Sequence, residues 1–178
     1  MNINNLKLED LCLIRIYKLF YLEILNLTEG NIETKIQCMT FLLSKYDIHL
    51  TPKFNEPIKF EFDYMVFSNK INDWIKKINF DFQEQIMIEK EVINDYAIKK
   101  ITIIANTLNE YLNQYETSIK LEKLIELCKI IYVAEMFIGY DFTVESISKN
   151  EKIDLQSEEI KNYIKILNKI DKNLMERW

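Results

Sequence analysis

Residues 58–78, IKFEFDYMVFSNKINDWIKKI, change their hydrophobic period within one short stretch. From Ile58 to Tyr64, apolar and charged residues alternate, which is the period of two that predicts an amphipathic strand. Apolar residues then recur at helical spacing over 69–78, and Ser68 is a suitable N-cap for that helix. The stretch therefore predicts a short strand followed directly by a short amphipathic helix.

Helical spacing of apolar residues dominates on both sides of this stretch. We expect further helices over residues 8–27, 32–46, 105–115 and 119–138, and from 157 onward. The first of them is apolar around nearly its whole circumference, which is typical of a central helix or of one at an oligomer interface. The second has a single apolar stripe. Between these two, Gly30 suits a left-handed helix end and Asn31 suits an N-cap.

Residues 79–104 fit two structures. Ile101 and Ile103, like the isoleucines near the start of the segment, alternate with polar residues, which favours a β-hairpin or wing. The alternative is one long helix from Gln83 to Leu112, because apolar residues also recur there at helical spacing. We prefer the hairpin. The predicted fold class is therefore mainly α, a compact helical domain with a small β-hairpin or wing that is winged-helix-like, and the alternative is an all-α bundle.

The chain of 178 residues fits a single domain, 1–178. A chain of this length buries enough surface to fold without a disulfide or a metal. No internal repeat or low-complexity linker marks a boundary. A second possibility is a winged-helix-like core over 1–104 with a helical extension over 105–178.

Scarce residue types exclude several kinds of chemistry. With only Gly30 and Gly139, the chain has no glycine-rich phosphate loop. With His49 as its one histidine and three dispersed cysteines, it has no ligand-spaced set for zinc and no arginine–histidine ribonuclease motif. The carboxylates of Glu89, Glu91 and Asp95 are interpreted as a solvated hairpin tip. We therefore expect no catalytic residues, no cofactor and no metal, and hence no enzyme, although a polar pocket at those carboxylates would favour one.

The N-terminus lacks a targeting signal, because no apolar segment preceded by basic residues occurs there. The apolar stretch within residues 8–27 is interrupted by Arg15, Lys18 and Glu23, which argues against a membrane span. The cysteines lie among apolar neighbours, as buried reduced thiols do. These observations predict a cytoplasmic protein.

The distribution of charge argues against a general affinity for nucleic acid. The net charge is -5, and the whole acidic excess falls after residue 78. A local exception is the helix at 68–78, where three lysines outnumber one aspartate. The residues expected to contact DNA in that case are Asn69, Lys70, Asn72, Lys76 and Lys77.

Two segments resemble a known family. Residues 35–43, KIQCMTFLL, are similar to a helix of YwgA-like and Panacea-domain proteins, and residues 62–75, FDYMVFSNKINDWI, resemble the segment that follows it. Met65 and Val66 replace the Gly-Pro of the family's turn. The resemblance covers roughly residues 10–80. It implies a mainly helical fold with a small β element and no enzyme activity. It also implies a regulatory or antitoxin-like role through binding another protein.

These observations predict a non-catalytic regulatory or protein-interaction protein, antitoxin-like or an adaptor. It is expected to act through apolar helical faces, those of residues 8–27 and of the last helix, on a protein partner or on a second copy in a homo-oligomer. The alternative is a winged-helix DNA-binding transcriptional regulator that uses the helix at 68–78.

Overall fold

The computed structural model describes residues 8–48, 60–62, 65–78, 94–136, 144–150 and 153–176. In chain order the elements are α1 (Leu8–Tyr17), the π-helix η2 (Lys18–Ile24), α2 (Ile32–Ser44), β1 (Glu61–Phe62), β2 (Val66–Phe67), α3 (Asn69–Ile78), α4 (Asp95–Leu112), α5 (Thr117–Met136), α6 (Val144–Ser148) and α7 (Ser157–Glu176). The described part of the chain is thus mainly helical with one small antiparallel sheet. The predicted fold class is confirmed.

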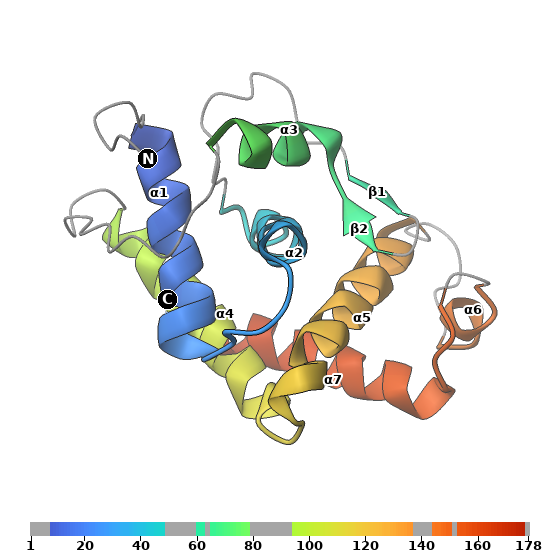
Figure 1. Cartoon of the computed structure of the whole chain (residues 1–178). Helices are drawn as coiled ribbons and strands as arrows, with labels where there is room; N and C mark the ends of the chain where they lie inside the picture. The colour runs from blue at the N-terminus through green and yellow to red at the C-terminus, as the bar shows by residue number, and fades with distance from the viewer. Residues whose placement is uncertain are drawn as a thin grey trace.

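Helix α2 lies at the centre of the molecule, with α1 on one side, α5 on another and α3 with the two strands above it (Figure 1). Every residue from Lys35 to Leu43 is buried. The prediction of a single apolar stripe on this helix was therefore wrong. Two polar side chains outside the predicted stripe, Lys35 and Gln37, are also buried, and both bond to backbone groups of neighbouring segments.

The predicted helix at 8–27 forms as two pieces. After α1 the backbone widens into η2, and the next hydrogen bond, from Leu25 N to Phe20 O (3.0 Å), spans five residues. Buried side chains come from nearly every side of α1 and η2, including Leu13, Ile14 and Tyr21. This segment therefore lies in the core of its own chain, one of the two places that its apolar circumference predicted.

The predicted helix starts at Asn31 and Ser157 are confirmed, whereas α4 and α5 begin before the predicted residues 105 and 119. Asn31 caps α2, because its Oδ1 accepts from the backbone N–H groups of Glu33 (2.7 Å) and Thr34 (3.4 Å). Gly30 has a φ of +93°, which favours glycine, but it lies in the turn before that cap and not at the end of the first helix. Helix α7 begins at the predicted Ser157.

The short sheet lies directly before α3. Its two strands pair antiparallel, with Glu61 opposite Phe67 and Phe62 opposite Val66. The strand predicted for 58–64 is confirmed at Glu61 and Phe62. Phe60 precedes the strand, and the other residues of that range lie outside the described part. Helix α3 has the predicted bounds.

The hairpin predicted for residues 79–104 was wrong at its second arm. Ile101 and Ile103 belong to α4, which Asn94 caps by accepting from the backbone N–H of Tyr96 (2.8 Å). Burial at Ile101, Ile104 and Leu108 follows helical spacing, so the alternation was a short coincidence with the helical pattern. The alternative of one helix agrees with the structure over 95–112, whereas residues 79–93 lie outside the described part.

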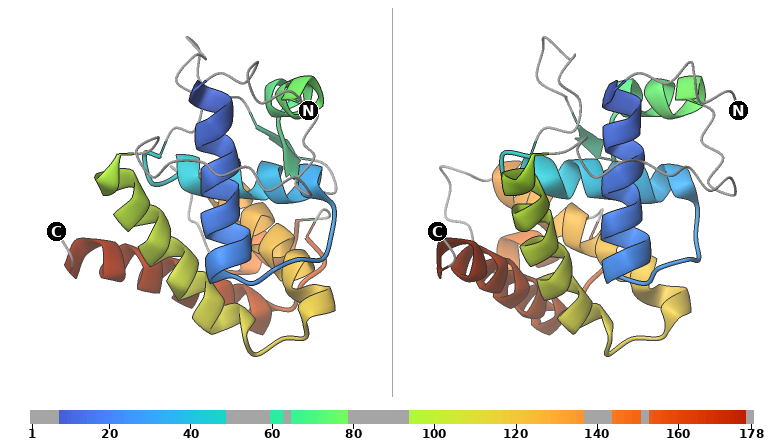
Figure 2. Two further views of the ribbon diagram at one scale, coloured as in Figure 1. Left: turned by 60° about the vertical axis from the view of Figure 1, so that its left-hand side comes forward. Right: turned by 90° about the vertical axis from the view of Figure 1, so that its left-hand side faces the viewer.

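Helices α4 and α7 pack against each other along one side of the molecule (Figure 2). The possible domain boundary at 104–105 falls inside α4. One cluster of buried apolar side chains contains residues from both sides of that boundary, including Phe41, Leu108 and Ile170. No helix in the described ranges has the length and apolar character needed to cross a membrane.

Candidate functional site

Helix α3 presents the residues that the sequence predicts for DNA contact. Asn69, Lys70 and Lys76 are exposed and Asn72 is half-buried. Lys77 belongs to the helix, but its side chain lies outside the described part. Asp73, three or four residues from Asn69 and Lys76, is exposed on the same face. The face is therefore polar and mixed in charge.

The opposite face of α3 holds the helix to the body of the protein. Ile71 and Ile75 are buried, and the indole Nε1 of Trp74 donates to Oδ1 of Asp10 at 2.9 Å. The described hairpin precedes α3, whereas the wing that the sequence predicts for residues 79–104 follows it.

The residues weighed as catalytic or metal-binding are not assembled into a site within the described part. His49, Glu89 and Glu91 lie outside it, and Asp95 is the first residue of α4, not a hairpin tip as predicted. A carboxylate at that position stabilises the positive end of the helix dipole. Among the described residues, no group of three or more His, Cys, Asp or Glu side chains is arranged to hold a metal ion. Cys38 and Cys128 are buried free thiols.

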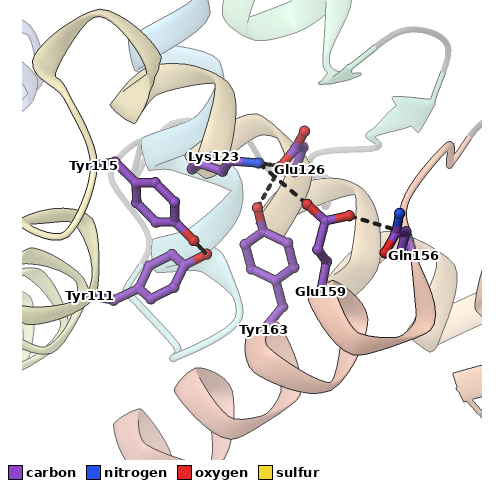
Figure 3. A network of polar contacts seen from close by, with 7 residues as sticks. All are labelled: Tyr111, Tyr115, Lys123, Glu126, Gln156, Glu159 and Tyr163. Carbon is purple, nitrogen blue, oxygen red and sulfur yellow. Dashed lines mark hydrogen bonds and ion pairs between the residues drawn. The ribbon is translucent and has the colours of Figure 1, made fainter.

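A polar network joins α5 and α7 (Figure 3). The Tyr163 hydroxyl donates to Oε2 of Glu126 at 2.5 Å, and Nζ of Lys123 lies 2.9 Å from the same oxygen. Lys123 also lies 3.8 Å from the carboxylate of Glu159, which accepts from the backbone N–H of Gln156 at 3.0 Å. The network thereby ties the start of α7 to the middle of α5.

The charges of this network compensate one another. Burial and the hydrogen bond to Glu126 raise the pKa of Tyr163 above its ordinary value. Burial lowers the pKa of Lys123, but the hydrogen bond and attraction to Glu126 and the charge of Glu159 outweigh it and leave that pKa raised. Each ionised group thus has a partner inside the network, so we interpret it as a clamp between helices rather than as a reactive site.

A cleft of about 390 Å³ lies where the end of α2, the start of α4 and the end of α7 meet. We name it the α2–α4–α7 cleft. Its lining consists of Lys45, Tyr46, Asp47, Tyr96, Lys100, Asp171, Leu174 and Met175.

The end of α2 shapes one wall of the cleft. The backbone N–H of Ile48 donates to the carbonyl of Leu43 (3.1 Å), and Asp47 has a φ of +59°. This is the hydrogen bond of a Schellman helix end, in which glycine usually takes the left-handed position that Asp47 occupies here. Aspartate tolerates that conformation better than most residues do. The turn thereby places residues 45–47 at the cleft.

Both lysines of the cleft are engaged within the chain. Nζ of Lys100 donates to the carbonyl of Tyr46 (3.4 Å) and lies 4.8 Å from the centre of the Tyr96 ring. Lys45 forms an ion pair with Glu135 and lies over the Phe41 ring. Cations at the carbonyl end of a helix are favourable, so these contacts stabilise the end of α2.

The two carboxylates of the cleft differ from its lysines in their contacts. Within the described ranges, neither Asp47 nor Asp171 forms a hydrogen bond or an ion pair. Partial burial raises the pKa of Asp171 above its ordinary value, and burial together with Asp171 raises the pKa of Tyr46. The cleft therefore presents two solvent-exposed carboxylates beside its two lysines.

Apolar surface borders the same cleft. The Tyr96 side chain is 48% exposed and that of Met175 is 79% exposed. By contrast, the apolar stripe of α7 that the sequence offered as a partner face is buried at Ile160, Tyr163 and Ile170. Sequence reasoning missed the cleft because its residues come from three distant segments.

No family model matches the chain, and no match was found among the curated proteins or the solved structures. The resemblance of residues 10–80 to YwgA-like and Panacea-domain proteins stays a prediction.

Proposed function

We propose that this is a non-catalytic, cytoplasmic regulatory or adaptor protein, antitoxin-like in role, that binds a protein partner. The observation that carries the proposal is the α2–α4–α7 cleft, where exposed Tyr96 and Met175 border a concave surface. Aromatic and methionine side chains are enriched at the centres of protein interfaces. The cleft combines apolar side chains with a few polar groups, as recognition sites in proteins do.

The proposal moves the partner surface away from the faces that the sequence suggested. Most apolar side chains of α1, η2 and α7 are buried in the chain's own core, so the apolar faces of these helices offer little free surface. Among the described residues, the exposed large apolar side chains are Leu22, Tyr96, Met136 and Met175. Two of these four line one cleft, which selects it as the contact surface.

The test uses variants of the full chain. Tyr96→Ser and Met175→Ser remove apolar surface at the cleft, whereas Met136→Ser removes a side chain of the same type that is 65% exposed on α5, outside the cleft. A partner is expected to co-purify from the native host with the parent and with Met136→Ser, and to be depleted with the two cleft variants. Equal recovery with all three variants contradicts the proposed surface.

Self-association is part of the same proposal, because a second copy is one possible partner. Size-exclusion chromatography with light scattering gives the molar mass of the parent. A dimer that dissociates in Tyr96→Ser but not in Met136→Ser identifies a second copy as the occupant of the cleft. A monomer at all concentrations leaves a different protein as the partner.

DNA binding through α3 is the second candidate function. It is favoured by the exposure of Asn69, Lys70 and Lys76 on one helix. Charge reversal at Lys76 and Lys77 should abolish a salt-dependent affinity for duplex DNA if this helix binds phosphates. An affinity that is absent in the parent, or unchanged in the double variant, contradicts this function.

A further inference from the structure

We propose that the α2–α4–α7 cleft accepts a lysine or arginine side chain, so that the partner protein docks through a basic segment. This inference rests on the proposed function and names the chemistry of its partner. It follows from the balance of charge at the cleft and from the apolar surface beside it.

The first step is that the positive groups of the cleft are already committed. Lys45 is paired with Glu135, and the Lys100 ammonium is held between the Tyr46 carbonyl and the Tyr96 ring. An acidic segment of a partner would compete with Glu135 for Lys45 and would share the Lys100 ammonium with the Tyr46 carbonyl. A basic segment leaves these contacts in place.

The second step is that the negative groups are not committed. Asp47 and Asp171 are solvent-exposed, and neither forms a hydrogen bond or an ion pair with another described residue. Helix α7 also ends beside the cleft, and the carbonyl end of a helix attracts cations, whereas Lys45 and Lys100 already lie at the end of α2. The start of α4 acts in the opposite sense, but the cap at Asn94 and the carboxylate of Asp95 reduce its attraction for anions.

The third step concerns the shape of the occupant. Lysine and arginine carry a charge at the end of an apolar stem, which packs on apolar surface while the charge reaches polar groups. Tyr96, Leu174 and Met175 supply that apolar surface next to Asp171. A small cation has no stem to use it, whereas a side chain on a partner segment fits both parts of the cleft.

The test uses the full chain labelled with nitrogen-15 and three synthetic peptides. They are acetyl-Gly-Arg-Leu-Arg-Gly-amide, the same peptide with citrulline at both arginine positions, and the same peptide with glutamate there. Citrulline keeps the shape of arginine and removes its charge. We expect the arginine peptide to shift the backbone amide signals of Tyr46, Tyr96 and Met175 in a saturable titration, and expect this binding to weaken with added salt.

Variants assign the effect to the carboxylates. Asp171→Asn should weaken binding of the arginine peptide by about two- to fivefold, because an ion pair at an exposed carboxylate contributes up to about 1 kcal/mol. Asp47→Asn should weaken it as well, and asparagine retains the tolerance for a left-handed backbone. Asp154→Asn, an exposed aspartate outside the cleft, is the matched control and should bind as the parent does.

Three outcomes overturn the inference. These are equal binding of the citrulline peptide, tighter binding of the glutamate peptide, and unchanged binding by Asp171→Asn. If the partner is nevertheless depleted by Tyr96→Ser, the proposed function stands and only the basic character of the partner fails. If the arginine peptide binds as expected but no partner depends on Tyr96, the cleft chemistry stands and the proposed function fails.

Discussion

The side-chain amide of Gln37 pairs with the backbone of Ser68 through two hydrogen bonds, each 3.0 Å long. Nε2 of Gln37 donates to the Ser68 carbonyl, and Oε1 accepts from the Ser68 N–H. Both residues are buried. The central helix α2 thereby satisfies the Ser68 N–H, which would otherwise lack a partner away from water. It also adds a second donor to the Ser68 carbonyl, which accepts from the backbone N–H of Asn72 at 3.0 Å.

Gln37→Leu should lower the free energy of unfolding by about 1–3 kcal/mol, because it leaves the buried N–H of Ser68 without a partner, whereas the Ser68 carbonyl keeps the N–H of Asn72. Urea denaturation measures the change. The matched control is Gln114→Leu, an exposed glutamine, which should stay within about 0.5 kcal/mol of the parent. Equal effects in the two variants would show that the pair contributes no net stability.

Gly30→Ala should destabilise the fold for two separable reasons. The φ of +93° disfavours any residue with a Cβ, at about 1–2 kcal/mol. In addition, the new Cβ would lie 2.4 Å from Cδ2 of Leu121, so that side chain has to move. In a double-mutant cycle with Leu121→Ala, only the second part should be relieved. Full relief would show that the backbone conformation has no cost, contrary to the prediction.

Stability should fall as the pH rises above about 10, because buried tyrosines must stay protonated in the folded state. Burial raises the pKa of Tyr17 to about 12 and raises those of Tyr21 and Tyr163 as well. In the unfolded chain the same groups lose protons near pH 10, so the unfolded state binds fewer protons between the two pKa values. The pKa of Lys35 is lowered, because burial outweighs the attraction of Glu29. This shift makes stability rise with pH, against the effect of the tyrosines, but it involves only one proton.

Urea denaturation between pH 8 and pH 11, followed with tyrosinate absorbance, measures this loss. Tyr163→Phe should be less stable than the parent by about 1–2 kcal/mol at pH 8, because it loses the hydrogen bond to Glu126. Its stability should also depend less steeply on pH, by about one proton. An unchanged slope would contradict the raised pKa of Tyr163.

Asp171→Asn should stabilise the protein at pH 7 while it weakens binding of the basic peptide. Partial burial raises the pKa of Asp171, so the folded state disfavours its charge. Stability is therefore gained as the pH falls through this raised value towards 3.8, the ordinary pKa. The thermal midpoint of the variant should exceed that of the parent at pH 7, and the two should converge below the ordinary pKa. A lower midpoint at pH 7 would reveal a stabilising partner for this carboxylate.

The sequence predicts the elements whose signals are local. Helix α3 and the start of α7 at Ser157 follow from hydrophobic spacing, and Asn31 follows from the chemistry of helix caps. The error at Ile101 and Ile103 has a physical reason. Two residues in alternation fit a strand and a helix equally well, and packing against η2 and α7 decides in favour of the helix.

The cleft could not be predicted, because it is a product of tertiary packing. Tyr46, Tyr96 and Asp171 are separated by dozens of residues, and no motif links them. The left-handed backbone of Asp47 has no signature in the sequence, since aspartate also occurs in ordinary turns. The burial of Gln37 in α2 could not be predicted for a related reason, because its hydrogen-bond partner, Ser68, lies at a distant point of the chain.

The central position of α2 has a consequence for the way this chain is made. Residues 32–44 leave the ribosome well before residues 117–136, the helix α5 that covers one of their sides. Until α5 emerges, a segment as apolar as Phe41-Leu42-Leu43 has no complete shelter from water. Nascent chains with this property are clients of chaperones and are prone to aggregate when synthesis stalls. Nascent chains on ribosomes arrested before residue 117 should therefore be bound by chaperones. The chaperones should have dissociated from nascent chains on ribosomes that have passed residue 176.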